Sequence, residues 1–162
     1  MIGKNVSESS KETKKWLRDL SWRKILLVGI LYTVFATVIR QIEVVLTMKY
    51  YQMPEFFGVW SKMMMPTAGP PSSNFIIMSL ILTFYPGVSL ALIYCYIRDY
   101  LPKSFWKRVF LFADLMISAS FIFFTLPCYL LFNLPVQLLV SWFISGFIIL
   151  TFTSFALVKI ID

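Results

Sequence analysis

Long runs of apolar residues, separated by short polar stretches, dominate the chain. Four runs are long enough to cross a bilayer as helices: about 24–48, 75–97, 108–132 and 136–160. Each holds about 20 or more residues, which is the length that a hydrocarbon core of roughly 30 Å requires. Strands of a membrane barrel would be about ten residues long and would alternate in polarity. The pattern predicts an all-α integral membrane protein, a four-transmembrane-helix bundle, with one membrane domain over 24–160.

Two further segments lie outside these runs. Residues 1–23 form a basic tail. Trp16, Leu17 and Leu20 would share one helix face there, a pattern typical both of an interfacial helix and of a frayed, solvated tail. The loop 49–74 contains a strongly apolar stretch, and we expect it to form a short amphipathic segment at the membrane interface. Its apolar residues are Phe56, Phe57, Trp60, Met63 and Met64.

Lysine and arginine are distributed unevenly between the two sides of these spans. Seven of them precede or open the first span, and four more lie between the second and third spans. The opposite side has only Lys49 and Lys62. Because basic residues mark the cytoplasmic side of a membrane protein, the bias predicts an N-in/C-in topology with both termini in the cytoplasm. We expect the protein to lie in the plasma membrane.

The composition agrees with a membrane protein and limits the kinds of ligand and cofactor that we expect. The chain is 59% hydrophobic with a mean hydropathy of +0.76, whereas soluble domains are nearer half apolar. Its net charge of +7 comes from residues that flank the spans, which argues against nucleic-acid binding. There is no histidine and no C-x-x-C pair, so we expect no metal and no other cofactor. The expected partners are the lipid bilayer and another membrane protein or a second copy of the chain.

Two charged residues interrupt the first span. Arg40 lies 16 positions beyond Lys24, or about 24 Å along a helix, close to the outer interface. Glu43 follows three residues later, at a spacing that lets the two side chains face each other. In one interpretation they are a mutually paired, snorkelling couple at a helix end. In the other, they point into the bundle and line a polar cleft.

The second and third spans contain further candidates for a ligand or partner site. Asp114 lies about 9 Å inside the third span. In one interpretation its carboxylate bonds to a neighbouring helix or to Lys107 or Arg108. In the other, it is an entry point for protons or a polar ligand. Pro86 interrupts the second span beside Tyr85. It predicts a packing kink, whose freed carbonyl groups would alternatively contact a ligand.

Small residues and prolines add predictions about packing. Small-xxx-small spacing lets helix backbones approach closely in lipid. Three spans show it, with Gly29, Thr33 and Thr37 in the first, Ser79, Thr83 and Gly87 in the second, and Ser141 and Ser145 in the fourth. Pro127 and Pro135 are expected to frame the outer turn between the last two spans. Cys95 and Cys128 fall at opposite ends of their spans, too far apart for a disulfide.

These observations favour a small non-enzymatic membrane protein that binds a membrane partner or lipid, for example as an accessory subunit of a larger complex. The alternative is a small oligomeric transporter or channel, with a polar path lined by Arg40, Glu43 and Asp114. A membrane enzyme acting on lipid ranks last, because no nucleophile–base pair is visible.

Overall fold

The computed structural model describes residues 21–51, 53–55 and 73–162. Most of the basic tail and the five apolar residues of the first loop lie outside the described residues. The elements in chain order are α2 (Trp22–Tyr51), α4 (Ser73–Ile97), the short 3-10 helix η1 (Arg98–Tyr100), α5 (Phe105–Ser120), the π-helical segment η2 (Phe121–Thr125), α6 (Leu126–Leu131) and α7 (Val136–Ile161).

The prediction of an all-helical chain with four long apolar helices is confirmed. The four that are long and apolar enough to span a membrane are Trp22–Tyr51, Ile76–Tyr100, Phe105–Leu131 and Val136–Ile161. They contain the predicted runs almost entirely and extend the first by a few residues at each end. Insertion and the N-in/C-in orientation remain predictions.

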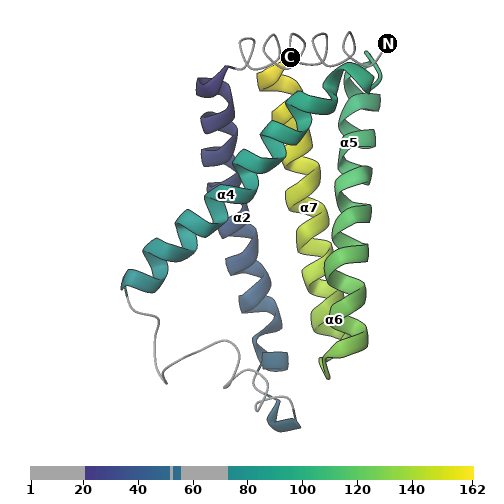
Figure 1. The fold of residues 1–162 in the computed structure, drawn as a ribbon. Helices are drawn as coiled ribbons and strands as arrows, with labels where there is room; N and C mark the ends of the chain where they lie inside the picture. The colour runs from purple at the N-terminus through teal and green to yellow at the C-terminus, as the bar shows by residue number, and fades with distance from the viewer. Residues whose placement is uncertain (1–20, 52, 56–72) are drawn as a thin grey trace, which may run out of the picture.

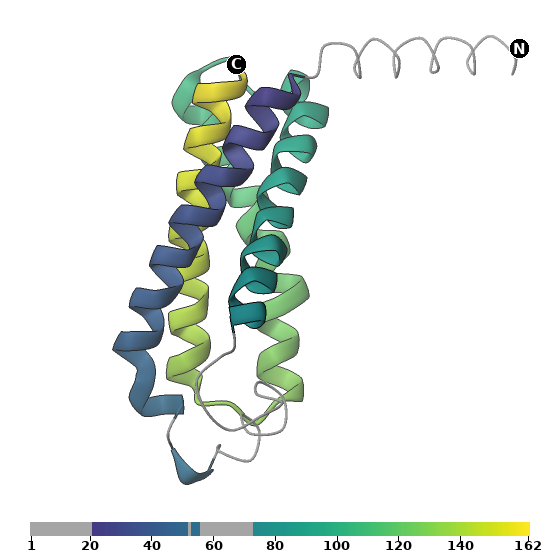
Figure 2. The same cartoon turned by 90° about the vertical axis from the view of Figure 1, so that its left-hand side faces the viewer.

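The four helices form an elongated bundle in which α2 and α7 are the central pair (Figure 1). α2 packs against α4 on one side and α7 on the other, and α7 also packs against α5. Figure 2 shows α2 and α7 running alongside each other for most of their length. We call the end that holds Trp22 and Ile161 the terminal end. The opposite end, which holds Tyr51 and Val136, is the loop end.

The buried apolar core lies at the terminal end. It combines side chains from all four helices: Ile25, Val28, Ala91, Tyr94, Cys95, Val109, Phe112, Leu157, Val158 and Ile161. Tyr94 and Phe112 pack edge to face with ring centroids 5.2 Å apart. In lipid, helices associate through such close packing because hydrophobicity alone gives no preference for protein over acyl chains.

Two glycines allow α2 and α4 to cross at close range. A Cβ atom added to Gly87 would lie 2.7 Å from the Cβ of Tyr32 and 3.0 Å from the Cα of Gly29. A Cβ atom added to Gly29 would lie 2.7 Å from a ring carbon of Phe84. The predicted close approach through small residues is confirmed at this crossing. By contrast, an added Cβ at Gly146 meets nothing within 4 Å.

The third span differs from expectation around Pro127. This proline does not frame the turn, because it lies inside α6, and the chain stays helical to Leu131. Proline has no N–H to donate to the carbonyl four residues earlier. The helix widens into η2 immediately before it, where the N–H of Leu126 donates to the carbonyl of Phe121, five residues back. Pro135, as predicted, borders the turn and caps α7.

α4 leaves the bundle toward the loop end. In Figure 1 it runs obliquely across α2, and its first turns lie far from α5. Pro86 lies within α4, which remains helical on both sides of it. α4 and α5 are joined through η1 and diverge toward the loop end in Figure 1.

Candidate functional site

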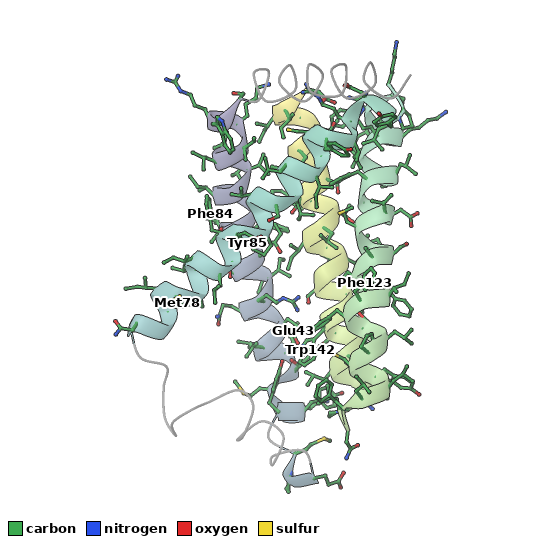
Figure 3. All side chains as sticks on the ribbon, in the orientation of Figure 1. Glu43, Met78, Phe84, Tyr85, Phe123 and Trp142 are labelled. Atoms are coloured by element: carbon green, nitrogen blue, oxygen red, sulfur yellow. The ribbon has the colours of Figure 1, made fainter. Side chains whose placement is uncertain are left out.

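A polar cluster joins α2 to α7 in the loop half of the bundle. Glu43 is only 6% exposed. Its Oε1 lies 2.8 Å from the hydroxyl of Ser141 on α7 and 2.9 Å from the hydroxyl of Thr47 on its own helix. Figure 3 shows Glu43 in this half of the bundle, with Trp142 labelled beside it. The indole N–H of Trp142 donates to the hydroxyl of Tyr51 over 2.8 Å, which continues the polar contacts outward.

Arg40 lies one turn nearer the terminal end on the same helix. A terminal nitrogen of its guanidinium donates to the hydroxyl of Ser145 over 2.9 Å. Unlike Glu43, Arg40 is exposed. Arg40 and Glu43 therefore each bond to a serine of α7, but only the carboxylate is enclosed between the helices.

The expected mutual pairing of Arg40 and Glu43 is not formed. Ion pairs in the described part of the chain join Arg98 to Asp99 and Arg108 to Asp162. The reason is geometric: the carboxylate of Glu43 points toward α7, and its Oε1 accepts from the hydroxyl groups of both Ser141 and Thr47. Serines 141 and 145, which the spacing singled out as small packing residues, are the hydrogen-bond partners that sequence reasoning missed.

A hydrogen bond at the terminal end indicates the register in which α2 and α7 pack against each other. The ammonium group of Lys24 donates to the carbonyl of Ile161 over 2.9 Å. Arg40 follows Lys24 by 16 positions, and Ser145 precedes Ile161 by 16 positions. Because antiparallel helices have the same rise per residue, these equal offsets bring Arg40 and Ser145 to the same level.

Arg40 borders a cavity of about 310 Å³ between α2, α4, α5 and α7. Most of its lining is apolar, and the polar side chains are few. The lining residues are Tyr32, Arg40, Pro86, Ser89, Leu90, Ile93, Met116, Ser120, Gly146, Ile149 and Leu150. A small set of polar groups within an apolar wall is typical of ligand sites in proteins.

Two further features lie beyond this cavity toward the loop end. A narrow cavity of about 30 Å³ shares Arg40, Ser120 and Gly146 with the larger one and reaches Trp142. Beyond it, an apolar groove of about 370 Å³ lies between η2–α6 and the start of α7, with Phe121 and Phe143 in its wall. Arg40 is the cation that borders both cavities.

The other predicted site residues are spread over the bundle. Pro86 lines the cavity of about 310 Å³, whereas the neighbouring Tyr85, labelled in Figure 3, is 71% exposed. Asp114 is exposed on α5 and is not among the residues that line the three cavities. The expected bond from Asp114 to Lys107 or Arg108 is absent among the described residues, because Arg108 bonds to Asp162 and to the carbonyl of Pro102 instead.

A second polar cluster, which sequence reasoning missed, closes the terminal end. The carboxylate of Asp162 accepts from the hydroxyl of Tyr94 over 2.7 Å and pairs with Arg108. It thereby links α7 to α4 and α5. The residues are far apart in sequence, so no local pattern could have identified the cluster. Within the described ranges, no three His, Cys, Asp or Glu side chains gather in a way that would hold a metal ion.

Comparisons with known proteins add no relative. The chain matches no family model, no curated protein and no solved structure. Its class therefore rests on the fold: four apolar helices of membrane-spanning length, compatible with a small membrane protein. Two features of the structure could serve a function within that class. They are the polar contact between α2 and α7 and the cavity that Arg40 borders.

Proposed function

We propose that this chain is a small integral membrane protein that acts by binding rather than by catalysis, and that it takes a lipid-class ligand in the interhelical cavity that Arg40 borders. The single observation that carries the proposal is the cavity of about 310 Å³, lined mostly by apolar side chains and bordered by the exposed Arg40. An acyl chain suits such a wall, and a polar headgroup suits its few polar groups.

The departure of α4 from the bundle supports lateral access. A lipid enters a membrane protein most directly from the side, between two helices, because its chain then stays in an apolar environment. Pro86 of α4 and Ser120 of α5 line the cavity, and these two helices diverge toward the loop end in Figure 1.

Gly146 offers a way to fill the cavity without disturbing a packed contact, since nothing lies within 4 Å of an added Cβ there. Gly146→Leu should abolish lipid that is retained through purification, measured by native mass spectrometry of protein released from nanodiscs. Ser118→Leu adds similar bulk to an exposed position of α5 and should leave retention unchanged. If both variants retain lipid as the unmodified protein does, the cavity is not a lipid site.

The orientation of the ligand site depends on the predicted topology, which needs its own test. Single cysteines at Ser10, Ser61 and Lys103, in a chain lacking Cys95 and Cys128, should be labelled from outside intact cells only at position 61. Reaction at position 10 or 103 in intact cells would reverse the orientation.

A second candidate function, association with a membrane partner as an accessory subunit, is favoured by Asp114. This carboxylate is exposed on α5 without an ion-pair partner among the described residues, although its helix is long and apolar enough to span a membrane. Intramembrane carboxylates usually pair with a cation on another helix. Asp114→Asn should weaken capture of a basic transmembrane partner, measured by in-cell cross-linking, and Asp99→Asn should not. Equal capture by both variants would remove this candidate.

A further inference from the structure

The guanidinium of Arg40 has hydrogen-bonding capacity that the described residues leave unused. It carries five N–H donors, and its hydrogen bond within the described part of the chain is the one to Ser145. The nearest carboxylate along its helix, Glu43, is turned toward Thr47 and Ser141. A cation therefore faces the cavity without an ion-pair partner from the described residues.

Such a cation selects an acidic ligand group. The fork of N–H donors on arginine matches the two oxygens of a carboxylate or a phosphate, and charge-assisted bonds of this kind are stronger than neutral ones. Placing an arginine within a membrane span is costly unless it reaches water or a partner. An acid group on the ligand would supply that partner at the place where the cavity meets Arg40.

The cavity also indicates where the rest of the ligand lies. From Arg40 it extends toward the terminal end, past Tyr32, which lies eight residues earlier on α2, or about 12 Å along the helix. Ile93 and Met116 line this part from α4 and α5. Away from Arg40 the lining is mostly apolar, with Ser89 and the hydroxyl of Tyr32 as its polar groups.

On this basis we infer that the ligand is an anionic amphiphile, with its acid group on Arg40 and a hydrocarbon chain directed toward Tyr32 and Met116. The inference rests on the proposed function. With the predicted topology, Arg40 lies near the outer interface, so the ligand has the orientation of an outer-leaflet lipid, head outward and chain toward the membrane centre. The shared chemistry is a carboxylate or a lipid phosphate attached to an acyl chain.

The test uses the full chain in phosphatidylcholine nanodiscs and two photoactivatable probes: a fatty acid with a diazirine midway along its chain, and the methyl ester of the same acid. The acid should label the protein at or near Met116 and Tyr32, and much more strongly than the ester. Arg40→Gln should reduce labelling by the acid about tenfold or more, since a charge-assisted hydrogen bond is lost, and should leave labelling by the ester unchanged. Lys49→Gln, the same change elsewhere on α2, should affect neither probe.

The outcomes separate this inference from the proposed function. Gly146→Leu should abolish labelling by both probes, and labelling that survives it would overturn the lipid site itself. If Gly146→Leu abolishes labelling but acid and ester label equally, or Arg40→Gln has no effect, the cavity binds lipid without selecting an acid, and the inference is wrong. Labelling lost in Val140→Phe, a change in the apolar groove, would place the chain on the opposite side of Arg40 and also contradict it.

Competition distinguishes the two sources of the acid group. Unlabelled oleic acid that displaces the probe more effectively than dioleoyl phosphatidic acid would identify a carboxylate ligand, and the reverse order would identify a lipid phosphate. Displacement by phosphatidylcholine as effective as by either acid would contradict the anionic ligand.

Discussion

The two ends of the bundle are held together by different interactions. At the terminal end, apolar side chains from four helices form a buried core, and Asp162 ties α7 to α4 and α5. At the loop end, α7 packs against α2 and against η2 and α6, and the contact between α2 and α7 contains the buried polar side chains of Glu43, Thr47 and Ser145. The described α4 lies away from the other helices there (Figure 1).

This difference predicts that the residues that stabilise the fold are not the residues that bind a ligand. Close-packed apolar contacts hold the helices in one arrangement, because any change in side-chain volume is felt directly. The loop half has less of this packing, and Arg40 lies where the cavity reaches it, with N–H donors that the described residues leave unused. We expect substitutions at the terminal end to change the free energy of unfolding and substitutions around Arg40 to change ligand binding.

The largest effect should come from the terminal core. Leu157→Ala removes a side chain that is 0% exposed and leaves a cavity, so it should lower the free energy of unfolding by about 2–5 kcal/mol. Leu131→Ala at the loop end, where the leucine is 76% exposed, is the matched control and should cost far less. Both are measured by reversible unfolding in mixed micelles. Equal losses would mean that the loop half is packed as firmly as the terminal half.

The α2–α4 crossing should be the next most sensitive position. Gly87→Ala forces a Cβ against Tyr32 and the backbone at Gly29, and overpacking of this kind costs about 1–3 kcal/mol. Gly146→Ala introduces the same side chain into open space and should be neutral or slightly stabilising, because alanine favours helix over glycine. Thermal unfolding of the two variants checks the difference. A stable Gly87→Ala variant would show that α4 is free to shift on α2.

A double-mutant cycle should show which residue is the partner of Glu43. Glu43→Gln removes the charge of the acceptor and Ser141→Ala removes the donor of one part-buried hydrogen bond, so the two changes should couple by about 0.5–2 kcal/mol. Arg40→Gln and Glu43→Gln should couple more weakly, because no ion pair joins these residues in the described structure. The reverse order of the two coupling energies would restore the mutual pair that the sequence spacing favoured.

The smallest effect should come from the Asp162 cluster. Tyr94→Phe keeps the edge-to-face packing on Phe112 but removes the hydroxyl that donates to Asp162, so it should cost about 0.5–1.5 kcal/mol. Tyr100→Phe, at a residue that is 86% exposed, is the control and should cost almost nothing. If Tyr94→Phe is as stable as the control, the packing alone closes the terminal end.

The helical architecture could be predicted because it depends on local properties of the chain. Run length, apolar composition and the absence of a period of two identify four long helices without reference to any neighbour. Gly29 and Gly87 were recognised as places of close approach for the same reason, since their spacing on one face is local. The error at Pro127 was also local: a proline was interpreted as a helix boundary, although the widened segment Phe121–Thr125 accommodates it.

The candidate site is different, because it depends on which helices meet and at what level. Arg40 and Glu43 were visible in the sequence, but their partners Ser145 and Ser141 lie about a hundred residues away. A spacing of three residues allowed the two charged side chains to pair. They do not pair because each one bonds to a different serine of α7. The sequence by itself determined four apolar helices with two charges near one end. The tertiary structure decided that the carboxylate is enclosed and that the arginine borders a cavity, because hydrogen bonds across the α2–α7 seam depend on helix register and direction rather than on local sequence.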